Sequence, residues 1–309
     1  MNIVIKNSDE LTDFEVDEIE QLLKIDSSDT SKKNIDKQYI RWKLIDNPYG
    51  SYSVLAFSDK DLLGFLSFTG KFLKGTVVYE LGDVIVKPEG RGKGVFFRML
   101  RKFHKEFPLL SCYGTPNEAA LPIELKVGYV MSTEHIDYRI SPCRLPIKHF
   151  FSKVGLGRLG SLIESIINSP LYFFGQLNEK NIESFQAASN PNCMLESDET
   201  QLNWRIKEYG GSYRFFCSDN AYFILKIFVK SGYCFGFVVL SSSHTRFDYM
   251  QLLSSLNGIG VNFMVELSGN KSRLKSIFSY CYRRVPFIHI GPDMDYGVEN
   301  FTALDGDNV

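Results

Sequence analysis

The sequence predicts an α+β fold in two tandem domains, with a mixed central sheet flanked by helices. Helix-type and strand-type hydrophobic patterns alternate along the chain. A glycine-rich basic turn joins a strand to a helix near residue 90, and the second half repeats a short pattern of the first. The length of 309 residues suits two domains, and the hydrophobic fraction of 44% is typical of a packed protein.

The first 140 residues carry apolar patterns of both periods. Helical spacing predicts helices over 14–23, 37–46, 94–107 and 118–126. Alternating or short apolar runs predict strands over 2–7, 53–57, 62–68, 77–86, 109–113 and 129–140. The turn Asn47-Pro-Tyr-Gly50 ends the second helix, and residues 58–61 form a hairpin connection. This order of helices and strands is typical of an α+β domain.

Composition and charge exclude several function classes. The net charge of −1 argues against nucleic acid as a main partner. The six cysteines form no C-x-x-C pair and the histidines have no metal-ligand spacing, so we expect core cysteines in a reducing compartment and no metal. The start of the chain lacks a signal-peptide pattern, and no run approaches the about 20 apolar residues of a membrane span. We therefore expect a cytoplasmic protein without a transmembrane segment.

The strand over 83–86 runs into the turn Lys87-Pro-Glu-Gly-Arg-Gly-Lys-Gly94, which opens a helix. The first turn of a helix presents unpaired N–H groups, and the helix dipole favours an anion there. Gly90, Gly92 and Gly94 allow close backbone approach, and Arg91 and Lys93 add positive charge. The turn predicts a phosphate or pyrophosphate site; the alternative is a solvated helix start without a ligand.

Two motifs resemble those of a known superfamily. Arg91-Gly-Lys-Gly-Val-Phe96 resembles the pyrophosphate signature of the GNAT acyl-CoA transferases, Gln/Arg-x-x-Gly-x-Gly/Ala, although Phe96 replaces the usual small residue. Asn117-Glu-Ala-Ala-Leu-Pro-Ile-Glu-Leu-Lys-Val-Gly-Tyr129 resembles the second signature. The resemblance implies acetyl-CoA as a co-substrate. It implies coenzyme contacts from Val84, Ile85, Val86, Arg91, Gly92, Lys93, Gly94, Val95, Phe96 and Asn117.

The resemblance also implies that strand 83–86 splays from strand 110–114, leaving a gap for pantetheine. Glu80 lies eleven residues before Arg91, a spacing at which GNAT enzymes place a catalytic glutamate that acts as the base. Asp83 is the competing base, and strand alternation predicts that it lies on the face opposite Glu80. Amides near Val84 to Val86 are expected to polarise the thioester carbonyl.

The sequence identifies the general acid less clearly than the base. Many GNAT enzymes have a tyrosine seven residues after the signature asparagine, and here that position is Glu124. A glutamate donates this proton only if burial raises its pKa. Tyr113 and Tyr129 are nearby phenols, and solvent is a further alternative. Asn117 itself either contacts the coenzyme or caps the following helix.

The second half echoes the first. Trp42-Lys43 recurs as Trp204-Arg205, at an offset of 162 residues, and Leu63-Gly-Phe recurs as Phe235-Gly-Phe after a larger offset. The two tryptophans are expected to be core anchors, with a sugar-stacking role as the alternative. The strand over 234–240 is followed by no glycine turn. We therefore expect an acyltransferase domain over 1–141, a connector over 142–177, and a degenerate GNAT-like domain without a coenzyme motif over 178–309.

The connector contains a basic, apolar and glycine-spotted segment over 144–160. It predicts one or two helices packed on a domain; the alternative is a cationic segment on an anionic membrane surface.

Together these motifs resemble bacterial tandem GNAT proteins that are associated with surface-polysaccharide biosynthesis. The resemblance implies direct acyl transfer from acetyl-CoA to an amino or hydroxyl group of a small or sugar-like acceptor. The alternative is a non-catalytic acyl-CoA-binding or scaffold protein. The sequence does not indicate the oligomeric state.

Overall fold

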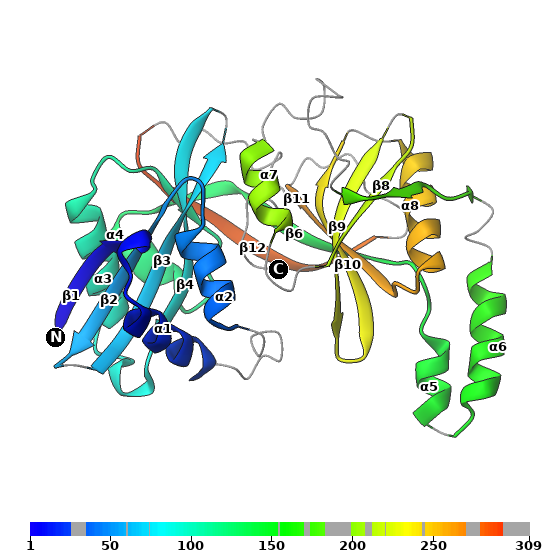
Figure 1. Cartoon of the computed structure of the whole chain (residues 1–309), viewed down its shortest axis with the longest axis horizontal. Helices are drawn as coiled ribbons and strands as arrows, with labels where there is room; N and C mark the ends of the chain where they lie inside the picture. Colours follow the sequence, from blue (N-terminus) through cyan, green and yellow to red (C-terminus); the bar gives the residue numbers. More distant parts are fainter. Residues whose placement is uncertain are drawn as a thin grey trace.

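The computed structural model describes residues 1–25, 35–59, 61–73, 75–153, 155–169, 174–182, 199–207, 212–219, 221–242, 245–269 and 279–292. Within these segments twelve strands form one mixed sheet with helices on both faces (Figure 1). This confirms the predicted α+β class and the mixed sheet. No helix in these segments is long and apolar enough to cross a membrane.

The elements follow the predicted order closely in the first 140 residues. The described strands are β1 (Asn2–Asn7), β2 (Ser51–Ser58), β3 (Asp61–Leu73), β4 (Thr76–Val86), β5 (Cys112–Gly114), β6 (Val130–Pro142), β7 (Asn178–Lys180), β8 (Tyr213–Cys217), β9 (Tyr222–Lys230), β10 (Tyr233–Ser241), β11 (Phe263–Gly269) and β12 (Tyr280–Ile290). The described helices are α1 (Asp13–Ile25), α2 (Lys37–Ile40), α3 (Val95–Glu106), α4 (Leu121–Val127), α5 (Ile147–Lys153), α6 (Gly157–Asn168), α7 (Glu199–Ile206) and α8 (Arg246–Gly258). A π-helical turn, η3 (Arg41–Ile45), continues α2, and short 3-10 turns lie at η1 (Ser8–Glu10) and η4 (Pro88–Gly90).

The strand order shows two similar halves. It runs β1-β2-β3-β4-β5-β12-β6-β11-β10-β9-β8-β7. From each end inward, four antiparallel strands lead to one parallel pair, β4–β5 in the first half and β10–β11 in the second. A helix connects each parallel pair, α3 in the first half and α8 in the second. The tandem repeat of the fold is thus visible in the topology.

The C-terminal strand β12 lies between β5 and β6, beside strands of the first half. In turn, β6 pairs with β11 of the second half. Pro286, which cannot donate to a ladder, stands next to a register shift of β12, where a missing donor is tolerated. The division at 141 and 178 stays a prediction about the sequence, because the sheet runs through it without a break.

The repeated tryptophans meet where the two halves join. Their rings stack with centroids 4.7 Å apart and an interplanar angle of 11°. Trp42 Nε1 donates to the Trp204 carbonyl at 3.0 Å, and Trp204 Nε1 donates to the Trp42 carbonyl at 2.9 Å. A cation also lies over each ring, Lys71 over Trp204 and Arg205 over Trp42. Both rings are buried, so they are core anchors, and they anchor the halves to each other.

The second predicted repeat, of Leu63-Gly-Phe by Phe235-Gly-Phe, is wrong because the two segments lie on strands that do not correspond. Gly64 lies on β3, the third strand from its end of the sheet, whereas Gly236 lies on β10, the fourth from the other end. Glycines recur in both strands for separate packing reasons. A Cβ at Gly64 would meet Met99 and Val95 of α3, and one at Gly236 would meet Ile227 and Leu225.

Candidate functional site

The glycine turn after β4 has a geometry that requires its glycines. Gly92 and Gly94 have φ angles of +74° and +71°, a region that side chains other than glycine rarely adopt. Gly90 is required for a different reason: a Cβ there would lie 2.9 Å from Val86 Cγ1 and 3.0 Å from Leu63 Cδ1. The turn is therefore packed against β3 and β4 at its start and open to solvent at its end.

The N-terminus of α3 follows this turn directly. The first bond into the helix runs from Arg98 N to Gly94 O at 3.1 Å, so the N–H groups of residues 95–97 have no acceptor within the helix. Gly94 is the N-cap and has no side chain to accept from them. Arg91 and Lys93 are exposed beside them, and Arg91 Nε donates to Val86 O at 3.0 Å. These groups form a cationic, donor-rich surface that suits a pyrophosphate.

The corresponding helix of the second half begins differently. Thr245 is the N-cap of α8 and forms a capping box with Asp248. The Asp248 carboxylate accepts from Thr245 N at 2.8 Å, and Asp248 N donates to Thr245 Oγ1 at 3.2 Å. An internal carboxylate therefore takes the place that an anionic ligand would occupy at this helix start.

Strands β4 and β5 separate beside the turn. Within the described residues they pair only at Tyr79–Cys112 and Glu80–Tyr113, while β4 continues to Val86. A bulge in β4 lies at Asp83, where the β3–β4 register shifts and φ is +37°. The predicted splay is thus present. Val84 and Val86 pack toward α3, and Ile85 packs toward α1.

The bulge overturns one prediction about the two carboxylates. Because Asp83 adds an extra residue to the strand, simple alternation fails, and its side chain accepts a hydrogen bond from Lys43 of η3. Asp83 is half-buried, with a side chain that is 25% exposed. It lies on the same side of the sheet as Glu80, not on the opposite side.

Glu80 is sealed inside the protein. Its side chain is 2% exposed and lies 3.7 Å from Lys71 Nζ, which is itself 5.1 Å from the centroid of the Trp204 ring. Gln201 of α7 also reaches the first half, where its Oε1 accepts from Phe72 N at 2.7 Å. Glu80 thus lies beneath a layer that the second half helps to build, and it is not open to solvent.

The two phenols have structural surroundings. Tyr129 is buried, and its hydroxyl lies 3.0 Å from His104 Nε2. Burial raises the pKa of Tyr129 and lowers the pKa of His104 to about 4. Tyr113 is fully buried and stacks on Phe287 of β12. The raised pKa makes Tyr129 a weaker proton donor, and Tyr113 packs in the core against β12.

Glu124 on α4 is also buried, with 2% exposure. Desolvation raises the pKa of its carboxyl from 4.5 to about 7. A glutamate can act as the general acid only if burial raises its pKa, and Glu124 meets this condition. Asn117 caps the turn before α4, since its Oδ1 accepts from Ala119 N at 3.0 Å and Ala120 N at 2.9 Å. The capping alternative is the one that the structure shows, and a coenzyme contact through Nδ2 stays a prediction.

The described residues contain no cluster of three or more His, Cys, Asp or Glu side chains that could hold a metal ion. The cysteines in this part of the chain are unpaired, and burial raises the pKa of Cys112 and Cys143.

The chain matches no known family model, and no curated protein sequence matches it. Solved structures are similar over nearly the whole chain. A proposed acetyltransferase from Pyrococcus horikoshii has a TM-score of 0.60 and 10% identity, over 97% of this chain and 93% of that one. A tandem GNAT protein from the clavulanic acid biosynthesis pathway has a TM-score of 0.55 and 10% identity, over 93% and 97%. This protein has a GNAT-like fold. A GCN5-related N-acetyltransferase from Anabaena variabilis is similar too, with a TM-score of 0.56 and 9% identity, over 93% and 72%.

Proposed function

We propose that the protein is an acyl-CoA-dependent acyltransferase that moves an acetyl group to an amino or hydroxyl group of a small or sugar-like acceptor. One observation carries the proposal. The N-terminus of α3 is uncapped, follows two glycines with positive φ, and lies beside the splayed strands β4 and β5. The GNAT-like fold supports a coenzyme A thioester at this place. The link to polysaccharides and the cytoplasmic location stay predictions of the sequence.

The coenzyme contacts divide by chemistry. N–H groups of Val95 and Phe96, together with Arg91 and Lys93, would hold the pyrophosphate. Backbone groups of Val84 to Val86, on the edge that β5 leaves, would pair with pantetheine and polarise the thioester carbonyl.

For proton transfer we propose Asp83 as base and Glu124 as acid. Asp83 is partly open to solvent, whereas Glu80 is buried against Lys71. Asp83 takes the proton of the acceptor, directly or through water, as the acceptor atom bonds to the carbonyl carbon. Glu124 gives its proton to the sulfur as the C–S bond breaks, because its pKa of about 7 keeps much of it protonated at neutral pH.

Calorimetric titration with acetyl-CoA tests the site. Wild type is expected to bind saturably, and a variant with Arg91→Glu and Gly94→Glu is expected to lose binding. Arg246→Glu is the matched control, because Arg246 is an exposed cation at the start of α8, where the capping box already satisfies the helix. No binding to wild type at millimolar coenzyme would refute the proposal. Far-UV circular dichroism checks that each variant is folded.

A non-catalytic acyl-CoA-binding protein is the second candidate, and the burial of Glu80 favours it. The two candidates differ in turnover. A transferase releases free CoA with some acceptor in an amine and sugar panel, and Asp83→Asn and Glu124→Gln each slow that release while coenzyme binding persists. A binding protein binds coenzyme with no release across the panel.

A further inference from the structure

Helices α5 and α6 form a hairpin that projects from the sheet (Figure 1). A surface helix normally turns its apolar side toward the protein. In α6 the buried residues are instead small or polar, namely Gly160, Glu164 and Asn168. Four of its five large apolar side chains point outward and are between 46% and 62% exposed: Leu159, Leu162, Ile166 and Ile167. We call these four side chains the α6 stripe.

Polar contacts fix this inverted orientation. Arg144 Nε donates to Glu164 Oε1 at 2.7 Å. Asn168 Oδ1 accepts from Leu145 N at 2.8 Å, and Asn257 Nδ2 of α8 donates to the Asn168 carbonyl at 3.0 Å. Rotating α6 to bury the stripe would break these bonds and expose a paired carboxylate. The stripe therefore requires a cover from outside the hairpin.

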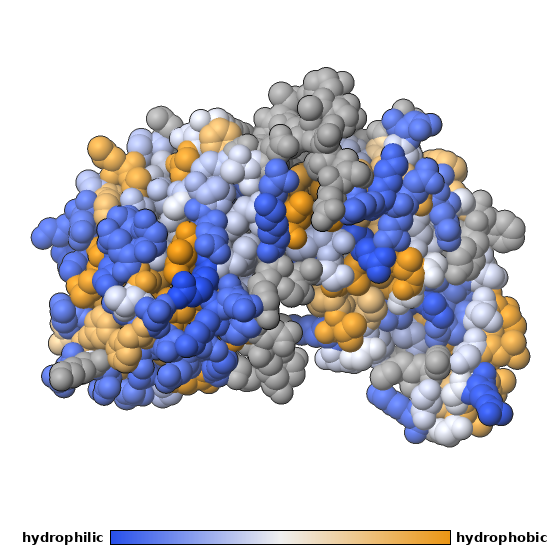
Figure 2. All heavy atoms as spheres, viewed as in Figure 1, coloured by the Kyte–Doolittle hydropathy of each residue, from blue (hydrophilic) through white to orange (hydrophobic). Residues whose placement is uncertain are grey.

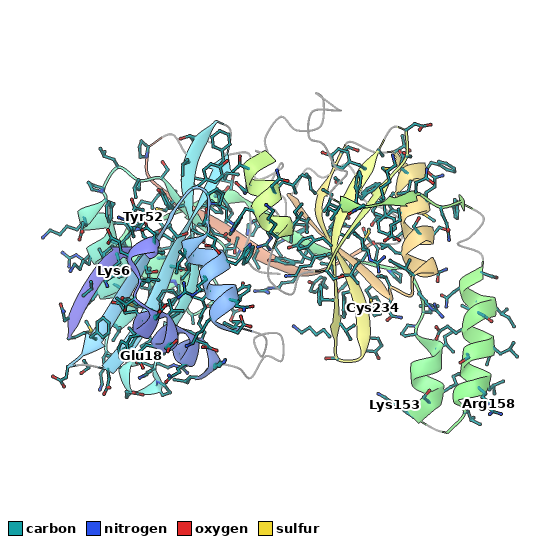
Figure 3. All side chains as sticks on the ribbon, in the orientation of Figure 1. Lys6, Glu18, Tyr52, Lys153, Arg158 and Cys234 are labelled. Carbon is teal, nitrogen blue, oxygen red and sulfur yellow. The ribbon has the colours of Figure 1, made fainter. Side chains whose placement is uncertain are left out.

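The charges of the hairpin indicate which cover fits. Lys153 and Arg158 lie at the tip, where α5 ends and α6 begins (Figure 3). The only carboxylate between residues 145 and 169 is Glu164, which is buried against Arg144. Figure 2 shows apolar surface on the outer side of the hairpin and hydrophilic surface near its tip. The exposed charges next to the stripe are thus cations.

We propose that the α5–α6 hairpin docks on an anionic membrane surface. The stripe would enter the boundary between headgroups and acyl chains, and Lys153 and Arg158 would pair with anionic headgroups. A second copy of the chain is the alternative cover, and the measurements below distinguish it from a membrane. α6 has 12 residues, so this contact is peripheral. The inference does not depend on acyl transfer.

Co-sedimentation of the full chain with vesicles tests the apolar contact. Wild type is expected to sediment with phosphatidylcholine vesicles that contain phosphatidylglycerol, less so at high salt. Leu162→Asn with Ile166→Asn is expected to weaken partitioning by about tenfold or more. Leu109→Asn is the matched control, since Leu109 is 81% exposed in the loop before β5 and its change should leave binding unaltered. Equal melting temperatures exclude misfolding as the cause.

A second pair of variants tests the charges. Lys153→Glu with Arg158→Glu is expected to abolish the preference for anionic over pure phosphatidylcholine vesicles. The same change at two exposed cations of α3, Arg101→Glu with Lys105→Glu, is expected to retain it. The proposal is overturned if wild type does not sediment with anionic vesicles, if the stripe variant binds like wild type, or if sedimentation equilibrium shows dimers that the stripe variant abolishes.

Discussion

The stacked tryptophans lead to a prediction about how the two halves unfold. Trp204→Phe keeps an aromatic ring in the stack but removes the Nε1–H donor to the buried Trp42 carbonyl. Leaving a buried acceptor unpaired costs about 1–3 kcal/mol. The smaller ring loses about 1 kcal/mol more in buried area. We expect a loss of about 2–4 kcal/mol in the free energy of unfolding.

The geometry is nearly symmetric, so Trp42→Phe should cost the same within about 1 kcal/mol. The two donor–acceptor distances are 3.0 Å and 2.9 Å, and the two residues are 6% and 7% exposed. The cost of the double variant should differ from the sum of the two single costs by about 0.5–1.5 kcal/mol, because the two side chains contact each other and each donates to the backbone of the other.

Unfolding in guanidinium chloride measures these values. The chain has two tryptophans, so each single variant keeps one indole as a fluorescent reporter at the junction. Fluorescence and far-UV circular dichroism should give the same midpoint if the halves unfold together. Tyr280→Phe, at a 70% exposed position, is the control and should change stability by less than about 0.5 kcal/mol. Unequal costs for the two tryptophans, or two separate midpoints, would refute the reasoning.

Three further predictions follow from burial and topology. The fold raises the pKa of Glu124 from 4.5 to about 7. The contribution of this group to the free energy of unfolding is therefore fully present below pH 4.5 and falls by about 3 kcal/mol as the pH rises through 7. Urea unfolding across this range should show that slope in wild type and a flatter one in Glu124→Gln. A fragment of residues 1–141 lacks β12, the strand between β5 and β6, and should show no cooperative thermal transition by calorimetry. Gly90→Ala should lose about 1–3 kcal/mol in chemical denaturation, because its Cβ would crowd Val86 and Leu63.

Local patterns were enough to predict the elements of the first half. The apolar spacing in α1 and α3 and the glycine turn between β4 and α3 depend on neighbours in sequence, so each was predicted to within a few residues. β5 is shorter than predicted. α4 begins later than predicted, because residues 118–120 form the turn that Asn117 caps. The second-half repeat was detectable through Trp204, whose contacts with Trp42 constrain both positions.

Long-range placement was not predictable in the same way. The position of β12 depends on pairing with β5 and β6, whose residues are more than 100 positions away, and its own sequence mixes arginines, tyrosines and a proline. The bulge places the Asp83 carboxylate on the same side of the sheet as Glu80. An alternating sequence pattern does not indicate that a strand contains a bulge. The layer that buries Glu80 is formed by Lys71 and by α7, which lie far apart in the sequence and meet only in the folded protein.

The two halves share a topology but differ where an anion could bind. At the start of α8 the Asp248 carboxylate accepts from Thr245 and lies at the positive end of the helix dipole, and Thr245 Oγ1 accepts from Asp248 N, so the chain itself supplies a cap and a negative charge there. At the start of α3 the N-cap is a glycine in the left-handed conformation, which offers no acceptor and leaves the donors of the first turn to solvent. A side-chain cap stabilises a helix by about 1 kcal/mol, and α3 lacks that contribution in the free protein. The asymmetry is what is expected if one copy retained a site for an external anion and the other replaced the ligand with its own carboxylate.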